Sequence, residues 1–482
     1  MVHEKVDAIY QQNAGVFASI EQIFHSAHGV PVDITRNNTK QRILAEINGE
    51  KAKRLLSSKR NILKSFFVYH GLMMFLAFGA IFGSRRKEIS SDVLFDCWSR
   101  NSMEFYEEII ANLKTDSILF FFNDSNKNYS SCRTTPNQMY QSCRRIKLFS
   151  KTASVEVLRF HYSKYFDYWK LSKKTSLNIL DLIVRMIYEV GTHLSMGDAI
   201  NTLMLVSAHD NGYTPYRYYF YKKCGIDSIM LLQNGGRVDL DASYNSYIYA
   251  DYYMAWSKDR LDNFTEMHCR KKFTPGSIRL SRRLDKYTKN VKGEYDIIFI
   301  EQLFTSTEVH GAPNHTAYIA GLINLIKLKQ NHNKIRVAYA CRPGRNNSRA
   351  SIIIQDINNK LKNSDVIMLE LDPLEIYGII LRTSIVVAFN SSVRCEALML
   401  SKTVLTCNYT GYANDYVVNN SCDNNVINSE QYDEFERKIL GALNKHRENS
   451  GIDLYKNNNC IENTGYNAST EIAGIINLHL GL

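Results

Sequence analysis

The sequence of 482 residues lacks the cysteine and histidine spacings that mark metal and disulfide sites. Its ten cysteines include no C-x-x-C pair, and its thirteen histidines form no H-E-x-x-H motif. We therefore predict neither a bound metal nor another cofactor, and scattered cysteines of this kind are typical of reduced thiols in a cytosolic protein. Repeats of solenoid length and sustained heptads are also missing, which excludes repeat arrays and coiled coils.

The composition indicates a folded protein with anionic partners. Apolar residues make up 45% and charged residues 22% of the chain, which excludes a disordered protein. Lysine and arginine outnumber aspartate and glutamate by 59 to 48, so the net charge is +11. This excess favours nucleotides, acidic glycans, phospholipid surfaces or nucleic acid, but no nucleic-acid motif is present and we do not predict that last partner.

One long apolar segment, residues 66–83 (FFVYHGLMMFLAFGAIFG), bears on the location of the protein. No signal peptide is expected, because this first apolar run lies far from Met1 and follows charged residues. The run has marginal length for a membrane span, and basic residues lie on both sides of it. The alternatives are a buried helix, a helix on the inner-membrane surface, or a span. We predict a cytoplasmic protein, with peripheral contact to the inner membrane under the second alternative.

The order of expected elements divides the chain into five parts, since its length exceeds what one core supports. Alternating strands and helices predict an α/β protein with two Rossmann-like, doubly wound parallel sheets. The parts are a helical N-terminal extension (1–89), a first Rossmann-like domain (90–257), a basic linker (258–292), a second Rossmann-like domain (293–446) and a C-terminal tail or helix (447–482).

Polar residues follow two predicted strands of the first domain: His209 and Asp210 after 202–207, and Gln233, Asn234 and Gly235 after 229–232. Ligands of open α/β sheets bind outside the carboxyl ends of the strands, so both turns are expected to face one cleft. Asp210 is a candidate base or nucleophile, and His209 can exchange protons near neutral pH. The alternative interpretation is that these residues cap a helix or form turns.

A turn rich in hydroxyl groups in the second domain predicts a phosphate site. Residues 385–389 (IVVAF) form an apolar strand, and Ser391 or Ser392 can cap the helix that follows. A helix N-terminus carries unpaired N–H groups and a partial positive charge, so an anion is stabilised there. Glu396, one turn later, is placed to accept hydrogen bonds from ribose hydroxyls. An ordinary capped crossover helix is the alternative.

Two more segments are expected at the same edge of the second sheet. The strand that ends at Cys341 is followed by Arg342, Pro343 and Arg345, and guanidinium groups beside a rigid turn suit bidentate contacts with phosphate. Gln302 begins a polar loop after the preceding strand, and this loop is expected to line the same pocket. A solvated turn is the alternative for the arginines.

The second half, with these motifs, looks like the donor-binding domain of a GT-B glycosyltransferase. It resembles in particular the bacterial capsule and lipopolysaccharide enzymes that use CMP-activated acidic sugars such as Kdo or sialic acid. In that group an HP motif and an SS motif hold the nucleotide phosphate and ribose, and Arg342-Pro343 and Ser391-Ser392 stand in their places. The segments GIDSIMLLQNGG and ADYYMAW resemble two motifs of its first domain, with Asn234 replacing the histidine of QHG.

The resemblance implies transfer of a sugar from a nucleotide-activated donor, without metal, to a bacterial surface glycan or a lipid-linked acceptor. The departing phosphate needs cations or N–H donors, and the reacting carbon needs a nearby carboxylate, for which Asp210 is the candidate. A sugar-nucleotide epimerase of the same fold is one alternative. Since Arg342 and Asn234 replace two histidines of the family, a non-catalytic nucleotide- or glycan-binding protein is the other.

Overall fold

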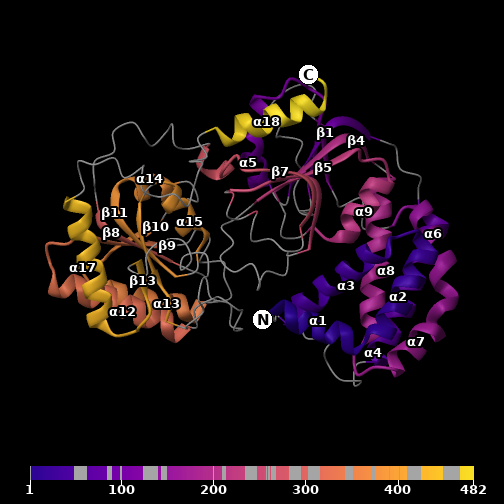
Figure 1. Ribbon diagram of the computed structural model, residues 1–482, viewed down its shortest axis with the longest axis horizontal. Helices are drawn as coiled ribbons and strands as arrows, with labels where there is room; N and C mark the ends of the chain where they lie inside the picture. Colours follow the sequence, from indigo (N-terminus) through magenta and orange to yellow (C-terminus); the bar gives the residue numbers. More distant parts are fainter. Residues whose placement is uncertain are drawn as a thin grey trace.

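The structure, a computed structural model, describes residues 2–47, 62–83, 89–97, 100–122, 139–142, 149–198, 200–208, 213–233, 247–256, 258, 261, 267–281, 295–301, 315–341, 351–370, 375–389, 391–400, 402–409, 425–448 and 467–482. It has two parallel sheets, each flanked by helices, and these form separate lobes (Figure 1). The predicted fold class, two Rossmann-like α/β domains, is therefore confirmed.

The first sheet has seven parallel strands in the order β3-β2-β1-β4-β5-β6-β7. Two of its strands, 118–122 (ILFFF) and 228–232 (SIMLL), are mainly apolar runs, as expected of strands that are covered on both faces. The strands are β1 (Ile89–Cys97), β2 (Ile118–Phe122), β3 (Met139–Ser142), β4 (Ile200–Ser207), β5 (Ser228–Leu232), β6 (Ile248–Met254) and β7 (Met267–Phe273).

The second sheet has six parallel strands in the order β10-β9-β8-β11-β12-β13. The sequence predicts strands over 295–301, 335–341, 365–370 and 385–389, and four strands of this sheet match these ranges to within two residues at each end. The strands are β8 (Tyr295–Ile300), β9 (Val337–Cys341), β10 (Ile367–Glu370), β11 (Thr383–Ala388), β12 (Thr403–Cys407) and β13 (Val426–Ile427). Helices α12 (His315–Asn331), α13 (Ser351–Lys362), α14 (Glu375–Leu381), α15 (Ser392–Met399) and α17 (Tyr432–Glu448) accompany this sheet.

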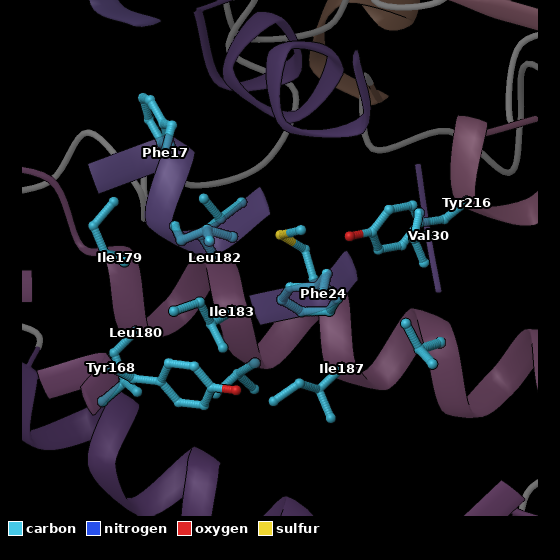
Figure 2. Packing of buried hydrophobic residues seen from close by; sticks show 14 of the residues in the cluster. Phe17, Phe24, Val30, Tyr168, Ile179, Leu180, Leu182, Ile183, Ile187 and Tyr216 are labelled. Carbon is cyan, nitrogen blue, oxygen red and sulfur yellow. The ribbon is translucent and has the colours of Figure 1, made fainter. Parts of the chain in front are cut away.

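The predicted N-terminal extension is helical, and it shares one core with helices of the first domain. Phe24 from the extension packs among Ile183, Ile187 and Tyr216, all of them buried (Figure 2). The extension holds α1 (Val2–Gln12), α2 (Ala14–His28), α3 (Val32–Ile47) and α4 (Ile62–Phe82). The first domain adds α5 (Arg100–Ala111), α6 (Lys151–His161), η4 (Tyr162–Lys164), α7 (Tyr165–Lys173), α8 (Ile179–Gly197) and α9 (Pro215–Lys223).

Helix α4 contains most of the long apolar segment and packs by one face against α6 and α8. Tyr69, Leu72 and Leu76 on that face are buried, which fits the buried-helix alternative. The opposite face is exposed and still apolar. Residues 64–82 are long and apolar enough to cross a membrane, but a third of this window is buried inside the protein.

The range expected to be linker, 258–292, contains a strand of the first sheet. Strand β7 pairs in parallel with β6, which corrects the prediction for residues 267–273. Its sequence, MHCRKKF, is basic and mostly exposed because β7 is the last strand at the edge of the sheet. Farther along, Gly276 follows Pro275 and adopts a φ of 97°, a backbone conformation that favours glycine. The exact boundary between the domains stays a prediction.

The last helix, α18 (Ala468–His479), returns to the first domain and packs on α5 (Figure 1). Ile472 and Ile476 are buried in the core of the first sheet. The side-chain amide of Asn477 accepts a hydrogen bond from Lys114 N at 2.9 Å and donates one to Asn112 O at 3.0 Å. The chain therefore crosses from the first domain to the second and back again.

Two histidines join the extension to the first domain. His28 Nε2 lies 2.8 Å from His161 Nε2, and His161 Nδ1 lies 2.5 Å from Tyr168 Oη. His28 Nδ1 faces Glu156 at 3.5 Å. One set of tautomers satisfies the row: Tyr168 donates to His161 Nδ1, His161 Nε2 donates to His28 Nε2, and the single ring proton of His28, on Nδ1, faces Glu156. Burial lowers the pKa of both histidines, although Glu156 partly opposes this for His28.

Acid is expected to destabilise the first domain through this pair. Because both pKa values are lowered in the folded state, the unfolded chain binds more protons once the pH falls below about 6.5. The free energy of unfolding should then decrease by up to about 1.4 kcal/mol per pH unit for each histidine. Urea unfolding at pH 7 and pH 5 measures this, and tryptophan fluorescence reports the first domain because every tryptophan precedes residue 257.

In a His161→Phe variant, the free energy of unfolding should decrease less between pH 7 and pH 5 than in the wild type. Substitution of the exposed His70 by glutamine is the control, and it should leave the wild-type decrease unchanged. Equal pH dependence in the wild type and in His161→Phe would show that the pair does not titrate as described.

Candidate functional site

Each sheet has one point where the strand order reverses, and ligands of doubly wound sheets bind outside the carboxyl ends of the strands at such a point. In the first sheet the point lies between β1 and β4, and in the second sheet between β8 and β11. The predicted His209-Asp210 turn directly follows β4, and the predicted Ser391-Ser392 turn directly follows β11. The topology thus places both predicted turns at switch points.

The structure describes only part of the predicted site. The predicted residues that lie outside the described part are His209, Asp210, Asn234, Gly235, Gln302, Arg342, Pro343 and Arg345. Their roles stay predictions. The backbone of Ser392 and the complete residues Gln233, Ser391 and Glu396 are described.

The predicted phosphate turn has the local geometry of a capped helix. Ser391 has an extended backbone, with φ −106° and ψ 140°, and α15 begins at Ser392. The Ser391 side-chain oxygen accepts a hydrogen bond from Val393 N at 3.4 Å, so this residue is the N-cap. Val393 N is used by this cap, and Arg394 N donates to the Ser391 carbonyl oxygen at 3.1 Å. The N-terminus of α15, with its partial positive charge, follows the carboxyl end of β11, a position that stabilises an anion.

Glu396 is placed differently from the prediction that it meets a ribose. Its side chain is fully buried, as is that of Arg394 on the same helix. Arg394 Nη1 donates to Thr406 Oγ1 at 3.3 Å, which connects α15 to the carboxyl end of β12. A carboxylate with no exposed surface cannot bind a sugar without rearrangement of α15. This placement favours a structural role for Glu396.

Gln233 holds two strand ends together. It is 2% exposed, and its Oε1 accepts a hydrogen bond from Trp256 N at 2.9 Å. The indole Nε1 of Trp256 donates to the Gln233 carbonyl oxygen, also at 2.9 Å. The two motif segments that resemble QHG and AD-x-x-x-x-W are thus adjacent in space. In this structure Gln233 joins the ends of β5 and β6 and does not line an open cleft.

The first switch point contains a buried acidic residue that the sequence analysis did not select. Asp96 on β1 lies opposite Ser207 on β4 and is 0% exposed. Its Oδ2 accepts hydrogen bonds from Ser207 Oγ at 2.9 Å and from Arg217 Nη2 at 2.7 Å. Burial opposes the charge of Arg217, but Asp96 outweighs this and raises the pKa of the guanidinium. The sequence signal that could have identified Asp96 is its position inside the otherwise apolar segment 93–97 (VLFDC).

Buried aromatic residues contact or form the described positions on either side of residues 209–212. On one side, the Ala208 N–H donates to Tyr106 Oη at 2.8 Å, and Tyr106 in turn donates to the carbonyl oxygen of Asp96 at 3.0 Å. On the other side, Tyr213 is buried and its ring lies 4.6 Å from the Arg217 guanidinium. The segment that carries Asp210 therefore begins and ends at fixed points around the Asp96–Arg217 pair.

The second switch point also has a buried acidic residue, Glu301, at the end of β8. Glu301 Oε1 accepts a hydrogen bond from Tyr339 Oη at 3.1 Å, and that hydroxyl lies 2.6 Å from Tyr318 Oη. Burial raises the pKa of Tyr339, so this hydroxyl keeps its proton. Within the described part of the chain, no group of three or more acidic, histidine or cysteine residues could hold a metal ion.

Comparison with known proteins gives fold similarity alone. No family model matches the sequence, and no curated protein is detectably similar to it in sequence. Solved structures of similar shape include the UDP-GlcNAc 2-epimerase from Methanocaldococcus jannaschii, with 13% identity, a TM-score of 0.44, and coverage of 81% of this chain and 100% of that one. Another is the wall teichoic acid polymerase TagF, with 12% identity, a TM-score of 0.45, and coverage of 88% and 99%. A third is a trehalose-6-phosphate synthase, with 11% identity, a TM-score of 0.42, and coverage of 81% and 97%.

Asp96→Asn is expected to destabilise the first domain strongly, because it leaves the Arg217 cation buried without its counter-charge. The free energy of unfolding should fall by about 3–5 kcal/mol. Asp296→Asn is the matched control, since Asp296 pairs with Arg336, whose side chain is 53% exposed, and should cost less than about 1 kcal/mol. Urea unfolding of both variants measures the difference. A similar decrease in the free energy of unfolding in the two variants would show that the buried ion pair stabilises the protein no more than the exposed one.

Proposed function

We propose that this protein is a glycosyltransferase that moves a sugar from a nucleotide-activated donor to a glycan or a lipid-linked acceptor. The observation that carries this proposal is the capped start of α15 at the switch point of the second sheet. A diphosphate or phosphate group there accepts from backbone N–H groups, and the predicted arginines 342 and 345 follow the nearby strand β9. The leaving group of the donor would be stabilised in this way.

Asp210 is proposed as the catalytic carboxylate. It follows β4 at the switch point of the first sheet, between the fixed positions Ala208 and Tyr213. It acts as the base that deprotonates the acceptor hydroxyl if the reaction inverts the anomeric centre, or as the nucleophile if the reaction retains it through a covalent intermediate. Asp96 supports this role as a positioning residue, because its contacts anchor the turn on both sides.

A CMP-linked acidic sugar is the proposed donor. Two features support it: the similarity of Arg342-Pro343 and Ser391-Ser392 to the motifs of enzymes that use such donors, and the net charge of +11. An acidic sugar brings a carboxylate in addition to the phosphate, which a basic protein attracts.

The donor proposal predicts selective stabilisation by CMP among CMP, CDP, UDP, GDP and ADP, each added without metal. A nucleotide that binds the native state only, at about 100 times its Kd, should stabilise the protein by about 2.7 kcal/mol, which shifts the melting curve visibly. Arg342→Ala and Ser392→Ala should each weaken binding by about 1–3 kcal/mol. Arg336→Ala is the control because Arg336 precedes the same strand, β9, at the opposite edge of the sheet.

A response to UDP or GDP instead of CMP would keep the transferase proposal and change the donor. Absence of any response would contradict the nucleotide site itself.

Asp210→Asn is predicted to keep nucleotide binding and to lower turnover by about 100- to 10,000-fold, because the amide can neither take a proton nor attack. Turnover is measured as nucleotide release from the stabilising sugar nucleotide, with and without a bacterial lipid extract as acceptor. The control is Asp227→Asn, an exposed position before β5. Wild-type activity of Asp210→Asn would remove Asp210 from the mechanism, and conversion of the sugar nucleotide without acceptor would identify an epimerase instead.

A further inference from the structure

The helical layer of the first domain contains a groove of about 700 Å³. One part of its lining is apolar: Val68, Leu72 and Phe75 from α4, and Val184 and Tyr188 from α8. The other part is polar and includes Arg42, Glu189, His193, Thr214 and Arg217. A groove with one apolar and one polar part suits an amphiphile, whose chain and head group need different surroundings.

The side chains of the polar part are connected by hydrogen bonds and ion pairs. Glu189 is buried and accepts hydrogen bonds from Arg42 and Thr214, with His193 Nε2 at 3.7 Å. Burial alone would raise the pKa of Glu189, but Arg42, His193 and Thr214 outweigh it and lower the pKa, so the carboxylate is charged. Arg217 connects the network to Asp96, and so to the switch point of the first sheet.

Two donors of this network have no hydrogen-bond partner. Arg42 Nε and Arg217 Nε are buried, and neither has a partner among the residues that the structure describes. Buried N–H groups without partners are costly, so a ligand rich in acceptor oxygens would satisfy them. A phosphate with its neighbouring ester oxygens has this character.

The apolar part borders an exposed apolar face of α4. Phe67, Met74, Phe78 and Ile81 are between 57% and 74% exposed and lie on one stripe of the helix, with Gly71 between them. Gly71 also lines the groove, so the exposed stripe and the groove meet at this residue. An exposed apolar stripe of this length marks a surface that binds a protein or a membrane.

The neighbouring helices favour a membrane. Tyr162 and Phe166 are 71% and 69% exposed, and Tyr165 between them packs on Phe66 of α4 at 5.3 Å between ring centroids. Basic residues lie in the same segments, and Lys173 lies over the ring of Trp169. Exposed aromatic rings with lysines beside an apolar helix face are typical of helices that lie in the interface of an anionic bilayer.

We propose that α4 lies on an anionic membrane and that one phospholipid enters the groove beside Gly71, with its acyl chain between α4 and α8 and its phosphate at Arg42 and Arg217. That this lipid site also receives the acceptor rests on the proposed function. Lipid binding itself needs no donor, so a failure of the transferase proposal leaves it standing.

Vesicle co-sedimentation tests the membrane face. Wild-type protein should sediment with vesicles of phosphatidylcholine and phosphatidylglycerol in equal parts, and less with phosphatidylcholine alone. The double variant Met74→Glu and Phe78→Glu should bind at least about tenfold more weakly, because it places two charges in the interface. Leu478→Glu on α18 is the matched control, since Leu478 is 80% exposed, and it should bind like the wild type. No sedimentation of the folded wild type would overturn the proposal.

Photocrosslinking tests the groove with the same vesicles, which carry a phospholipid with a diazirine in its acyl chain. Wild-type protein should be labelled on peptides of α4 and α8, including Tyr188. Gly71→Phe should fill the entrance without disturbing the helix, because a Cβ at Gly71 meets no atom within 4 Å. It should keep vesicle binding and lose the α8 label, while Gly71→Ala keeps both. Labels confined to the exposed stripe, or α8 labels that persist in Gly71→Phe, would overturn the groove as a lipid site.

Discussion

The ion pair between Asp96 and Arg217 is the constraint on which the first domain depends. Asp96 belongs to β1 at the centre of the sheet, and Arg217 belongs to α9, which packs against the helical layer. A buried charge pair is retained only where its geometry is well satisfied, because each partner alone would carry a large desolvation cost. The pair therefore connects three parts: the carboxyl edge of the sheet, the residues Ala208 and Tyr213 on either side of 209–212, and the polar part of the groove between α4 and α8.

Helix α4 shows how one segment can serve both a core and a surface. Its buried face supplies Tyr69, Leu72 and Leu76 to the same core as α8, and its other face stays apolar although it is exposed. A helix that is apolar all round is expected to be buried on all sides or to contact lipid. In α4 one face is buried in the core, and the other face is exposed and available for contact with lipid. The extension is thus an integral layer of the first domain, and it presents an exposed apolar surface.

The sequence predicted the second sheet more completely than the first. Strands β8, β9, β10 and β11 are apolar runs separated by clear helices, so their periodicity identifies them. Strand β7 was assigned to a linker because its residues are basic, a pattern that edge strands and loops share. The N-cap at Ser391 was predictable because capping is a local property of one turn. The burial of Glu396 was not, because it depends on how α15 packs.

What the sequence determined by itself was local: the alternation of strands and helices, most strands of the second sheet, and the N-cap before α15. These features follow from spacing along the chain, which periodicity and capping encode directly. The tertiary structure alone determined which charged side chains form ion pairs. Glu189 meets Arg42 across 147 positions of sequence, and Asp96 meets Arg217 across 121. Such contacts form only when distant elements pack, and their energies depend on burial, which no local pattern specifies.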